Sequence, residues 1–322
     1  MAALHEYDRL EHLEDKNLQW FVVNWCLGST CNFSCSYCPE SLHDGKRQWH
    51  STENVKSFVD KVKSVHPDKQ VYFEFTGGEV TVNKDFIEIC KYCTQQGVKA
   101  GFITNGSRTV RWYEENKRYF DHVVMSFHSE FADPDHFCKI VETLRLDVRT
   151  HINIMMNPEK WDLCVDVANR VKDIGNISIA LQPLIHDLAS QLYDYTPEQH
   201  QLMTDQHALY GSQIKWTKGF DYYRGAMKAV KRDGSFNPRT AHSFINKNTN
   251  NWQGWECWAG VEQLIVDIDG SVWRGWCRVG GRIGFINDPN LILPKSPILC
   301  NKNLCHCNFD IMSTKIRQLG GV

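Results

Sequence analysis

Hydrophobic positions in the first 185 residues follow two alternating patterns. Short apolar runs rich in β-branched and aromatic residues predict buried strands, at 20–26, 71–75, 100–104, 122–127, 150–155 and 177–181. Between these runs, apolar residues recur at helical spacing, as Val55, Phe58 and Val62 do. The predicted helices are 51–65, 85–96, 110–119, 134–144 and 161–172. Strict alternation of strands and helices favours a parallel sheet covered by helices.

The number of units limits the architecture. A closed eight-unit barrel takes about 250 residues, and this stretch is too short for that. We therefore expect an α/β fold in which residues 18–185 form a partial (β/α)6 barrel, after a charged lead-in at 1–17. Residues 186–256 are polar and are expected to form a linker with one or two helices. Residues 257–322 are expected to form a small cysteine-rich α+β domain with a β-hairpin, since QLIVDI and SVWRGW flank Asp269-Gly270.

Charge adds little to this picture. The chain has 36 Lys+Arg and 38 Asp+Glu, a net charge of -2, so bulk charge does not favour nucleic acid or an acidic membrane as a partner. Residues 215–232 mix basic and aromatic side chains, which can bind a nucleotide, but we interpret them as a solvated helix face. No apolar run approaches the ~18 residues of a membrane helix, and no secretory signal is evident, so a cytoplasmic protein is expected.

Thirteen cysteines are a high count for this chain. Without a secretory signal, metal or redox chemistry is a better explanation than disulfides. Five cysteines fall on apolar strand or helix positions and are predicted to be core residues: Cys26, Cys90, Cys93, Cys138 and Cys164. The other eight form two groups, near the start and near the end: Cys31, Cys35 and Cys38, and Cys257, Cys277, Cys300, Cys305 and Cys307.

The first group follows the first predicted strand, in the run CNFSCSYC. Three thiolates in one short loop can hold an iron–sulfur cluster and leave one iron without a protein ligand. An open metal position lets a small molecule bind through its amine and carboxylate. The alternative is a zinc knuckle with His43 or His50 as the fourth ligand, and the spacing alone does not decide between the two.

A second motif, Thr76-Gly77-Gly78-Glu79, ends the second predicted strand, and together with CNFSCSYC it resembles the radical SAM superfamily. The resemblance covers residues 17–185 and implies that Cys31, Cys35 and Cys38 ligate a 4Fe-4S cluster. It implies further that Gly77, Gly78 and Glu79 hold the methionyl amine of S-adenosylmethionine, and that Tyr37 lies near the adenine. The implied chemistry is reductive cleavage of S-adenosylmethionine to a 5'-deoxyadenosyl radical that removes a hydrogen atom from a substrate.

Polar residues at the ends of later strands complete the expected site. The resemblance suggests that four of them seat the carboxylate, ribose or adenine of the cofactor: Asn105, Ser126, Asn153 and Gln182. His128 also lies at a strand end, and because histidine titrates near neutrality we predict that it contacts substrate or accepts a proton. The alternative for His128 is a structural histidine.

The second cysteine group flanks the predicted hairpin and resembles the twitch domain, a shortened relative of the SPASM extension of radical SAM enzymes. That resemblance implies one auxiliary 4Fe-4S cluster, and the alternative is a structural zinc ribbon. A closed cluster takes four thiolates, so one of Cys257, Cys277, Cys300, Cys305 and Cys307 would be free, and the spacing does not show which. A spare thiol suits hydrogen donation in an epimerase, whereas a closed cluster suits an electron acceptor in an oxidation.

The sequence therefore predicts a radical SAM oxidoreductase or epimerase acting on a small polar metabolite such as a sugar, aminocyclitol or nucleotide. Oxidation is the leading reaction of the two, because twitch relatives include alcohol-oxidising dehydrogenases. An electron donor such as flavodoxin or ferredoxin is an expected partner. The alternative substrate is a peptide or protein side chain, which the short lead-in disfavours because it leaves no room for a leader-binding domain. The alternative outside enzymology is a zinc- or cluster-binding module.

Overall fold

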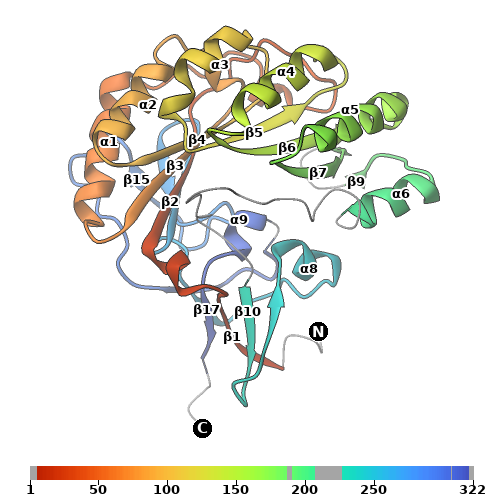
Figure 1. Ribbon diagram of the computed structural model, residues 1–322. Coiled ribbons are helices and arrows are strands. Elements are labelled where there is room, and N and C mark those ends of the chain that lie inside the picture. Colours follow the sequence, from red (N-terminus) through yellow and green to blue (C-terminus); the bar gives the residue numbers. More distant parts are fainter. Residues whose placement is uncertain (1–5, 187–190, 207–226, 306, 319–322) are drawn as a thin grey trace. The chain divides into compact units, whose positions relative to one another are not determined.

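A computed structural model describes residues 6–186, 191–206, 227–305 and 307–318 (Figure 1). Its contacts group the chain into two units. The α/β unit comprises Cys26–Thr52 and Glu74–Phe220, and the terminal unit comprises Met1–Trp25, Glu53–Phe73 and Asp221–Val322. Most of the basic and aromatic segment at 215–232 lies outside the described residues. The domain boundaries drawn from the sequence group the chain differently and stay a prediction.

All six strands predicted from apolar runs are present. They are β2 (Trp20–Cys26), β3 (Gln70–Thr76), β4 (Lys99–Thr104), β5 (His122–Phe127), β6 (Arg149–Met156) and β7 (Ser178–Pro183). The five predicted helices also form, as α1 (Thr52–Val65), α2 (Phe86–Gln95), α3 (Val110–Asn116), α4 (Pro134–Leu144) and α5 (Trp161–Ile174). Local signals explain their ends: the Asp133 side chain accepts a hydrogen bond from the His136 N–H at the start of α4, and Gly175, with φ +71°, follows α5.

In the α/β unit, β4, β5, β6 and β7 pair in chain order and all in parallel. Helices α2 to α5 cover these strands (Figure 1). Buried aromatic rings join the two layers, with centroids 5.1 Å apart between Phe86 and Phe102 and 5.3 Å apart between Phe127 and Phe137. The expected α/β fold with a parallel sheet is confirmed, and the carboxyl ends of its strands lie along one edge.

The terminal unit contains the predicted hairpin. Strand β13 (Gln263–Val266) runs antiparallel to β14 (Ser271–Trp273), and β14 pairs onward with β15 (Arg282–Phe285). The turn uses Gly270 at φ +80°, and the Asp269 side chain accepts a hydrogen bond from the Ser271 N–H at 2.9 Å. Strand β13 also pairs in parallel with β2.

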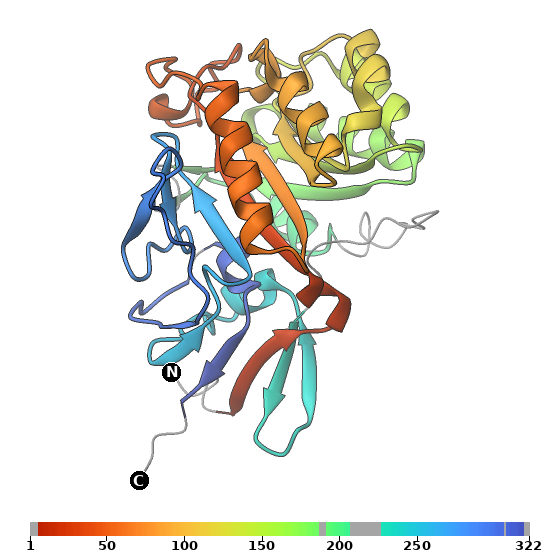
Figure 2. The same cartoon turned by 90° about the vertical axis from the view of Figure 1, so that its left-hand side faces the viewer.

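A second sheet of the terminal unit gathers strands from both ends of the chain. Its order is β11 (Phe236–Arg239), β10 (Met227–Lys231), β1 (Tyr7–His12), β17 (Lys315–Arg317), β12 (Trp255–Cys257) and β16 (Ile298–Leu299). Figure 2 shows β1 between β10 and β17. No element was predicted for the charged lead-in that forms β1. Tyr7 and Leu10 of this strand are buried in a core with Trp252 and Phe244 of α8 (Ala241–Asn246).

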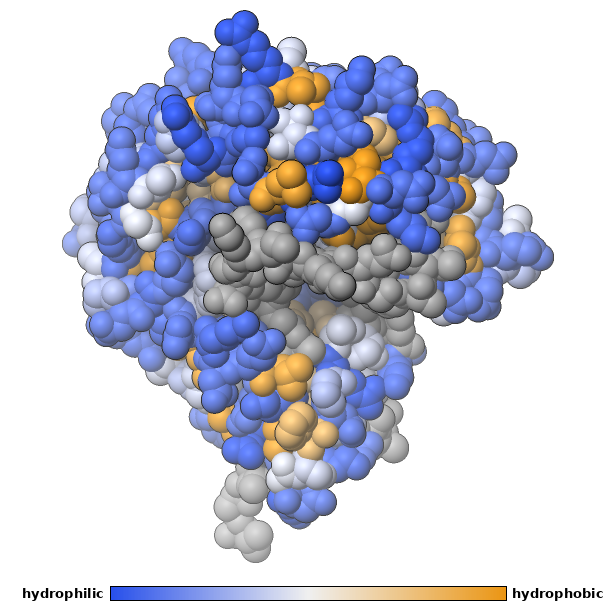
Figure 3. Space-filling model, in the orientation of Figure 1, coloured by the Kyte–Doolittle hydropathy of each residue, from blue (hydrophilic) through white to orange (hydrophobic). Residues whose placement is uncertain are grey.

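The polar stretch after β7 contains short elements, namely β8 (Ile185–His186), β9 (Gln191–Leu192) and α6 (Pro197–Thr204). One or two helices were expected within residues 186–256, and α6 is one that the described residues contain. The five cysteines predicted as core residues are all buried. On the face shown in Figure 3, polar residues predominate and hydrophobic side chains form small separate groups. Within the described ranges, no helix is long and apolar enough to cross a membrane.

Candidate functional site

The loop that carries the first cysteines lies against the Gly-Gly-Glu segment. Backbone hydrogen bonds join them: the Leu27 N–H donates to the Thr76 carbonyl at 2.8 Å, and the Gly78 N–H donates to the Gly28 carbonyl at 2.9 Å. A Cβ on Gly77, whose φ is +116°, would lie 2.5 Å from the Gly28 oxygen. A Cβ on Gly78 would collide with the Thr30 carbonyl. The glycine pair is therefore needed for two backbones to approach each other closely.

Glu79 is fully buried, and its carboxylate binds the end of strand β4. One carboxylate oxygen accepts hydrogen bonds from the Thr81 N–H at 3.0 Å and the Thr104 hydroxyl at 2.8 Å, and the other accepts the Asn105 N–H at 2.6 Å. Burial raises the pKa of Glu79, and these donated hydrogen bonds oppose the rise. Both oxygens are thus engaged with protein donors. A direct contact with the methionyl amine stays a prediction, while the geometry shows a positioning role.

Asn105 reaches the cysteine loop from the end of β4. Its amide nitrogen donates to the Asn32 side-chain oxygen at 3.0 Å and lies 3.9 Å from the Cys31 sulfur. Ser107 donates to the same Asn32 oxygen at 3.3 Å. The structure therefore brings a predicted cofactor residue to the first predicted cluster ligand.

The three thiols of the loop influence one another. Burial raises the pKa of all three and takes that of Cys35 to about 12, with further increases from the negative charges of Glu130, Cys38 and Cys31. Three soft sulfur donors in one loop fit an iron–sulfur cluster, whose positive irons would stabilise the thiolates. The His43 Nε2 atom, a zinc ligand in the alternative, lies 3.2 Å from the Cys38 carbonyl oxygen. Across the described parts of the chain, no three His, Cys, Asp or Glu side chains are grouped closely enough to hold a single metal ion.

The segment after β5 holds the cysteine loop in place. The Tyr37 hydroxyl and the His128 Nδ1 atom are 2.8 Å apart, and the two rings stack with centroids 5.9 Å apart. The Glu130 carboxylate accepts hydrogen bonds from the Ser36 N–H at 2.8 Å and the Ser36 hydroxyl at 2.5 Å. Burial lowers the pKa of His128 to about 4, so its ring is neutral at neutral pH. Its role as a base stays a prediction, because these contacts describe a structural histidine.

The polar residues predicted on the later strands lie together. Ser126 and Asn153 are register partners on β5 and β6, and the Gln182 amide nitrogen donates to the Asn153 oxygen at 3.4 Å. The same oxygen lies 3.0 Å from the His151 Nε2 atom. These side chains form a polar row across the strands. Their contact with the cofactor stays a prediction.

A cavity of about 410 Å³ opens beside the cysteine loop. It is lined by Ser34, Cys35, Ser36, Tyr37, Cys38, Pro39, Glu40, His43, His186 and Tyr193. The His186 and Tyr193 rings stack with centroids 4.0 Å apart, across the β8–β9 hairpin. Its volume suits a small molecule. Sequence reasoning missed both rings because it treated this stretch as a linker, and it missed Glu130 because only the histidine of SFHSEF was considered.

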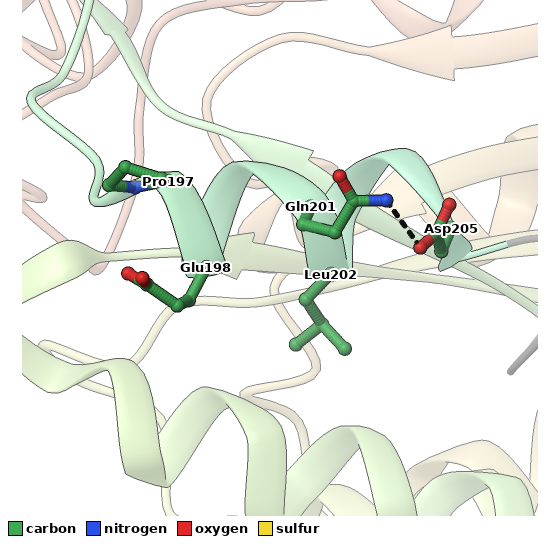
Figure 4. A pocket seen from close by; sticks show the side chains of 5 residues that line it. All are labelled: Pro197, Glu198, Gln201, Leu202 and Asp205. Carbon is green, nitrogen blue, oxygen red and sulfur yellow. Dashed lines mark hydrogen bonds between the residues drawn. The ribbon is translucent and has the colours of Figure 1, made fainter.

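A second hollow, of about 490 Å³, lies on α6 (Figure 4). Its five lining residues all come from that helix or its ends, and the Gln201 amide donates to the Asp205 carboxylate at 2.6 Å. None of the residues predicted for the site lines it. We assign no ligand to this surface.

In the terminal unit, three of the five remaining cysteines pack together. Cys257 and Cys300 are buried in one cluster, against which Cys277 packs, whereas Cys305 is buried in a second cluster with Trp252 and Ile311. Electrostatic interactions link Cys257 with Cys300, Cys277 with Cys257, and Cys305 with both Cys257 and Cys277. Cys307 is the N-cap residue of α9 (Asn308–Ile311). Four thiolates are the donor set that closes an iron–sulfur cluster.

Asp310 of α9 fixes the loop that carries Cys277. Its carboxylate accepts hydrogen bonds from the Cys277 N–H at 2.7 Å, the Trp276 N–H at 3.1 Å and the Gln263 side-chain amide at 3.0 Å. A Cβ on Gly275 would lie 2.7 Å from the Asp310 Oδ1 atom, so the close approach requires glycine. Burial and, to a smaller degree, the negative charge of Asp310 raise the pKa of Cys277 to about 12.

Comparisons with known proteins find a family and relatives that match part of the chain. Residues 25–175 match the model of the radical SAM superfamily. The chain is 25% identical over 96 residues to the S-adenosylmethionine-dependent nucleotide dehydratase of Fibrobacter sp. (strain UWH6), covering 28% of this chain and 29% of that protein. It is 35% identical over 111 residues to the mycofactocin maturase MftC of Mycolicibacterium smegmatis, covering 34% of this chain and 27% of that protein. The matches thus span less than a third of either relative.

Solved structures share the fold over more of the chain. Streptococcus suis SuiB bound to S-adenosylmethionine aligns with a TM-score of 0.55 and 13% identity, over 84% of this chain and 64% of that chain. The structure of anSMEcpe with bound AdoMet aligns with a TM-score of 0.52 and 17% identity, over 84% of this chain and 78% of that chain. The parallel α/β fold and the cysteine loop agree with the family match, and residues 25–175 are a radical SAM domain.

Proposed function

We propose that this chain is a radical SAM enzyme that abstracts a hydrogen atom from a small polar metabolite. The observation that carries the proposal is the set of three mutually interacting thiols, Cys31, Cys35 and Cys38, in a loop that borders a cavity of about 410 Å³. When bound together at such a loop, a 4Fe-4S cluster and S-adenosylmethionine supply a 5'-deoxyadenosyl radical.

In this proposal, the residues of the chain bind and position the cluster and the cofactor. Cys31, Cys35 and Cys38 hold the cluster. Gly77 and Gly78 keep the backbone of their strand end against the cysteine loop, where side chains would collide. Hydrogen bonds of Asn105 to Glu79 and to Asn32 connect the end of β4 with the Gly-Gly-Glu segment and the cysteine loop. Tyr37, supported by His128, presents a flat ring to the cavity for the adenine of the cofactor.

We assign the substrate to the same cavity, with a nucleotide as the leading class. The stacked rings of His186 and Tyr193 offer a planar surface to a base or sugar, and Ser34, Ser36 and Glu40 add polar groups. Two relatives are named for nucleotide chemistry, the nucleotide dehydratase of Fibrobacter sp. and the GTP 3',8-cyclase of Actinobacillus pleuropneumoniae. A sugar, an aminocyclitol or a peptide side chain is a competing outcome of the substrate test.

For the terminal unit we propose that Cys257, Cys277, Cys300 and Cys305 hold one auxiliary 4Fe-4S cluster. Four protein thiolates close such a cluster, which suits the acceptance of an electron from an oxidised substrate better than direct substrate binding. This favours oxidation over epimerisation. The external reductant in the proposal is a low-potential donor of the flavodoxin or ferredoxin class, in the cytoplasm.

Anaerobic reconstitution tests the proposal. The wild-type chain should bind about eight irons and release 5'-deoxyadenosine from S-adenosylmethionine under a strong reductant. The variant with Cys31, Cys35 and Cys38 replaced by Ala should retain about four irons and lose at least 1000-fold in cleavage. Cys138→Ala, at a buried cysteine outside both groups, is the control and should keep about eight irons and full cleavage.

Stoichiometric zinc without cleavage would refute the enzyme proposal. The substrate class follows from deuterium transfer into 5'-deoxyadenosine, measured by mass spectrometry with perdeuterated nucleotides, sugars and peptides offered separately. Transfer from a nucleotide supports the leading class, and transfer from a peptide alone overturns it.

A further inference from the structure

Lys315 is a lysine buried beside the second cysteine group. It begins β17 and is only 1% exposed. Lysine side chains are almost never fully buried without a partner that stabilises the charge. The surroundings of Lys315 therefore indicate what that partner is.

The hydrogen bonds of Lys315 define its protonation state. Its Nζ atom donates to the carbonyl oxygens of Asp310 at 2.8 Å, Ile311 at 3.0 Å and Ser313 at 2.9 Å. Three donated bonds require the ammonium form, because a neutral amine has only two N–H donors. The nitrogen also lies 4.8 Å from the centroid of the Trp252 ring, whose face attracts cations. The side chain is therefore a buried positive charge.

Carbonyl dipoles and an aromatic face do not neutralise a full charge. Among the residues that the structure describes, Lys315 forms no ion pair with a carboxylate. The side-chain carboxylate of Asp310 instead accepts hydrogen bonds from Cys277, Trp276 and Gln263. A buried charge without a counter-charge is strongly unfavourable. The Lys315 ammonium therefore lacks a direct ion-pair partner among the described residues, and a bound anion would stabilise it.

Two cysteines of the terminal unit lie near Lys315. Cys257 stands directly opposite Lys315 in the antiparallel ladder of β12 and β17, so the two side chains share one face of the sheet. Cys305 is buried in the same cluster as Trp252, whose ring Lys315 contacts. Burial raises the pKa of Cys257 and of Cys305, and the positive charge of Lys315 is the largest influence that opposes the rise in both. Two of the four proposed ligands thus lie in the field of this cation.

We propose that Lys315 is the built-in counter-charge of the four-thiolate auxiliary cluster and that it raises the cluster's reduction potential. The inference rests on the proposed auxiliary cluster. One-electron reduction by an external donor adds one negative charge to the cluster, and a fixed cation stabilises that added charge. Lys315 is a positioning residue in this account, since it acts through the ligands Cys257 and Cys305. The negative charge of Asp310 lowers the reduction potential of the same cluster.

Redox titration of the reconstituted full chain tests this, with the first cluster removed by replacing Cys31, Cys35 and Cys38 with Ala. In this background, Lys315→Met and Lys315→Gln should each bind about four irons. Their midpoint potential should be lower than that of the parent, by at least a tenfold change in the one-electron equilibrium constant, or 59 mV. Lys231→Met, at a partly exposed lysine of the same sheet that pairs with Glu6, is the control and should match the parent.

Asp310→Asn is the opposite-sign variant, and its midpoint potential should move to a higher value. Unchanged potentials in both Lys315 variants, or a lower potential in Asp310→Asn, would overturn the inference. Should neither Lys315 variant retain iron, Asp310→Asn decides by the direction of its shift. A parent protein that binds zinc, or no iron in the terminal unit, would instead show that the proposed auxiliary cluster itself is wrong.

Discussion

The α/β unit and the terminal unit each gather cysteines, but by different means. In the α/β unit, Cys31, Cys35 and Cys38 belong to one continuous loop, which is held by the Gly-Gly-Glu segment and by Glu130. In the terminal unit, the four proposed ligands are spread along the chain from Cys257 to Cys305, and the pairing of β12 with β16 and β17 and the hydrogen bonds of Asp310 position their segments. The first group depends on local sequence, and the second depends on strands that meet only after the chain has folded.

The charges around the two groups differ as well. The acidic side chains Glu79 and Glu130 raise the pKa values of Cys31 and Cys35 respectively, whereas Lys315 lowers those of Cys257 and Cys305. In all four cases, burial is the larger influence and raises the pKa. A site that is surrounded by carboxylates needs its positive charge from what it binds, such as iron and a sulfonium cofactor. A cluster closed by four protein thiolates can take its counter-charge from the protein itself.

The largest expected effect comes from removing one proposed ligand of the auxiliary cluster. Cys305→Ser should lose the auxiliary iron, about four atoms per chain, because it removes one of the four proposed ligands. Cys164→Ser, at a buried cysteine of α5 outside both groups, is the control and should keep its iron. Iron and sulfide analysis after anaerobic reconstitution measures both. Equal iron loss in the two variants would contradict the assignment of Cys305.

The next test disturbs the first loop and leaves the second group intact. Gly78→Ala pushes a methyl group against the Thr30 carbonyl, which should cost about 1–3 kcal/mol of unfolding free energy and the iron of the first site. Gly97→Ala is the control, since its Cβ meets nothing within 4 Å and only its φ of +67° is unfavourable, costing about 1 kcal/mol. Denaturant unfolding and iron content measure the effects. Retention of all the iron in Gly78→Ala would show that the close backbone approach is dispensable.

Low pH should destabilise the terminal unit through the protonation of Glu262. This buried carboxylate lies 3.1 Å from the His12 Nε2 atom and accepts the Thr314 N–H at 2.9 Å. These groups lower the pKa of Glu262 below its ordinary value of 4.5, although burial opposes them. A lowered folded pKa contributes stability above the unfolded value, and this contribution is lost as the pH falls through the folded pKa.

Glu262→Gln should therefore cost about 2 kcal/mol of unfolding free energy at pH 7, and the cost should shrink below pH 4.5. Denaturant unfolding at several pH values measures the difference. Glu114→Gln, at an exposed ion pair with Lys117, should change little at any pH. A cost for Glu262→Gln that does not vary with pH would disprove the linkage.

The smallest expected effect concerns the support of the first loop. Tyr37→Phe removes the hydrogen bond to His128 and keeps the ring stack, so the unfolding free energy should fall by about 1 kcal/mol. Tyr119→Phe removes a hydroxyl for which the described residues offer no hydrogen bond, and it should be neutral. Urea unfolding of the iron-free chain measures both. Identical stabilities would mean that the loop does not depend on this contact.

Several elements could be predicted because their signals are local. Strands β2 and β5 begin and end where their apolar runs do, since both are nearly continuous buried stretches. Strand β1 could not be predicted, because Tyr7, Leu10 and His12 are buried only through pairing with β10 and β17, more than 200 residues away along the chain. The stacked rings of His186 and Tyr193 were missed for a similar reason, as they lie in a polar stretch without periodicity.

The candidate site also combines features with local sequence signals and features that depend on tertiary contacts. The Gly77-Gly78 pair was recognised from its motif, but its packing against Gly28 and Thr30 required the structure. His128 was chosen for its titration near neutrality, and burial against Tyr37 lowers its pKa to about 4. Burial of this kind depends on neighbours from other strands, and a residue type does not reveal it.

The sequence by itself determined the parallel α/β architecture and the first cysteine loop, because hydrophobic period and ligand spacing are properties of short segments. The tertiary structure packed Cys257, Cys277 and Cys300 together, and it placed Lys315 and Asp310 beside them. The physical reason is that sheet pairing between distant strands sets both distance and burial, and these in turn set the charge that a site can hold.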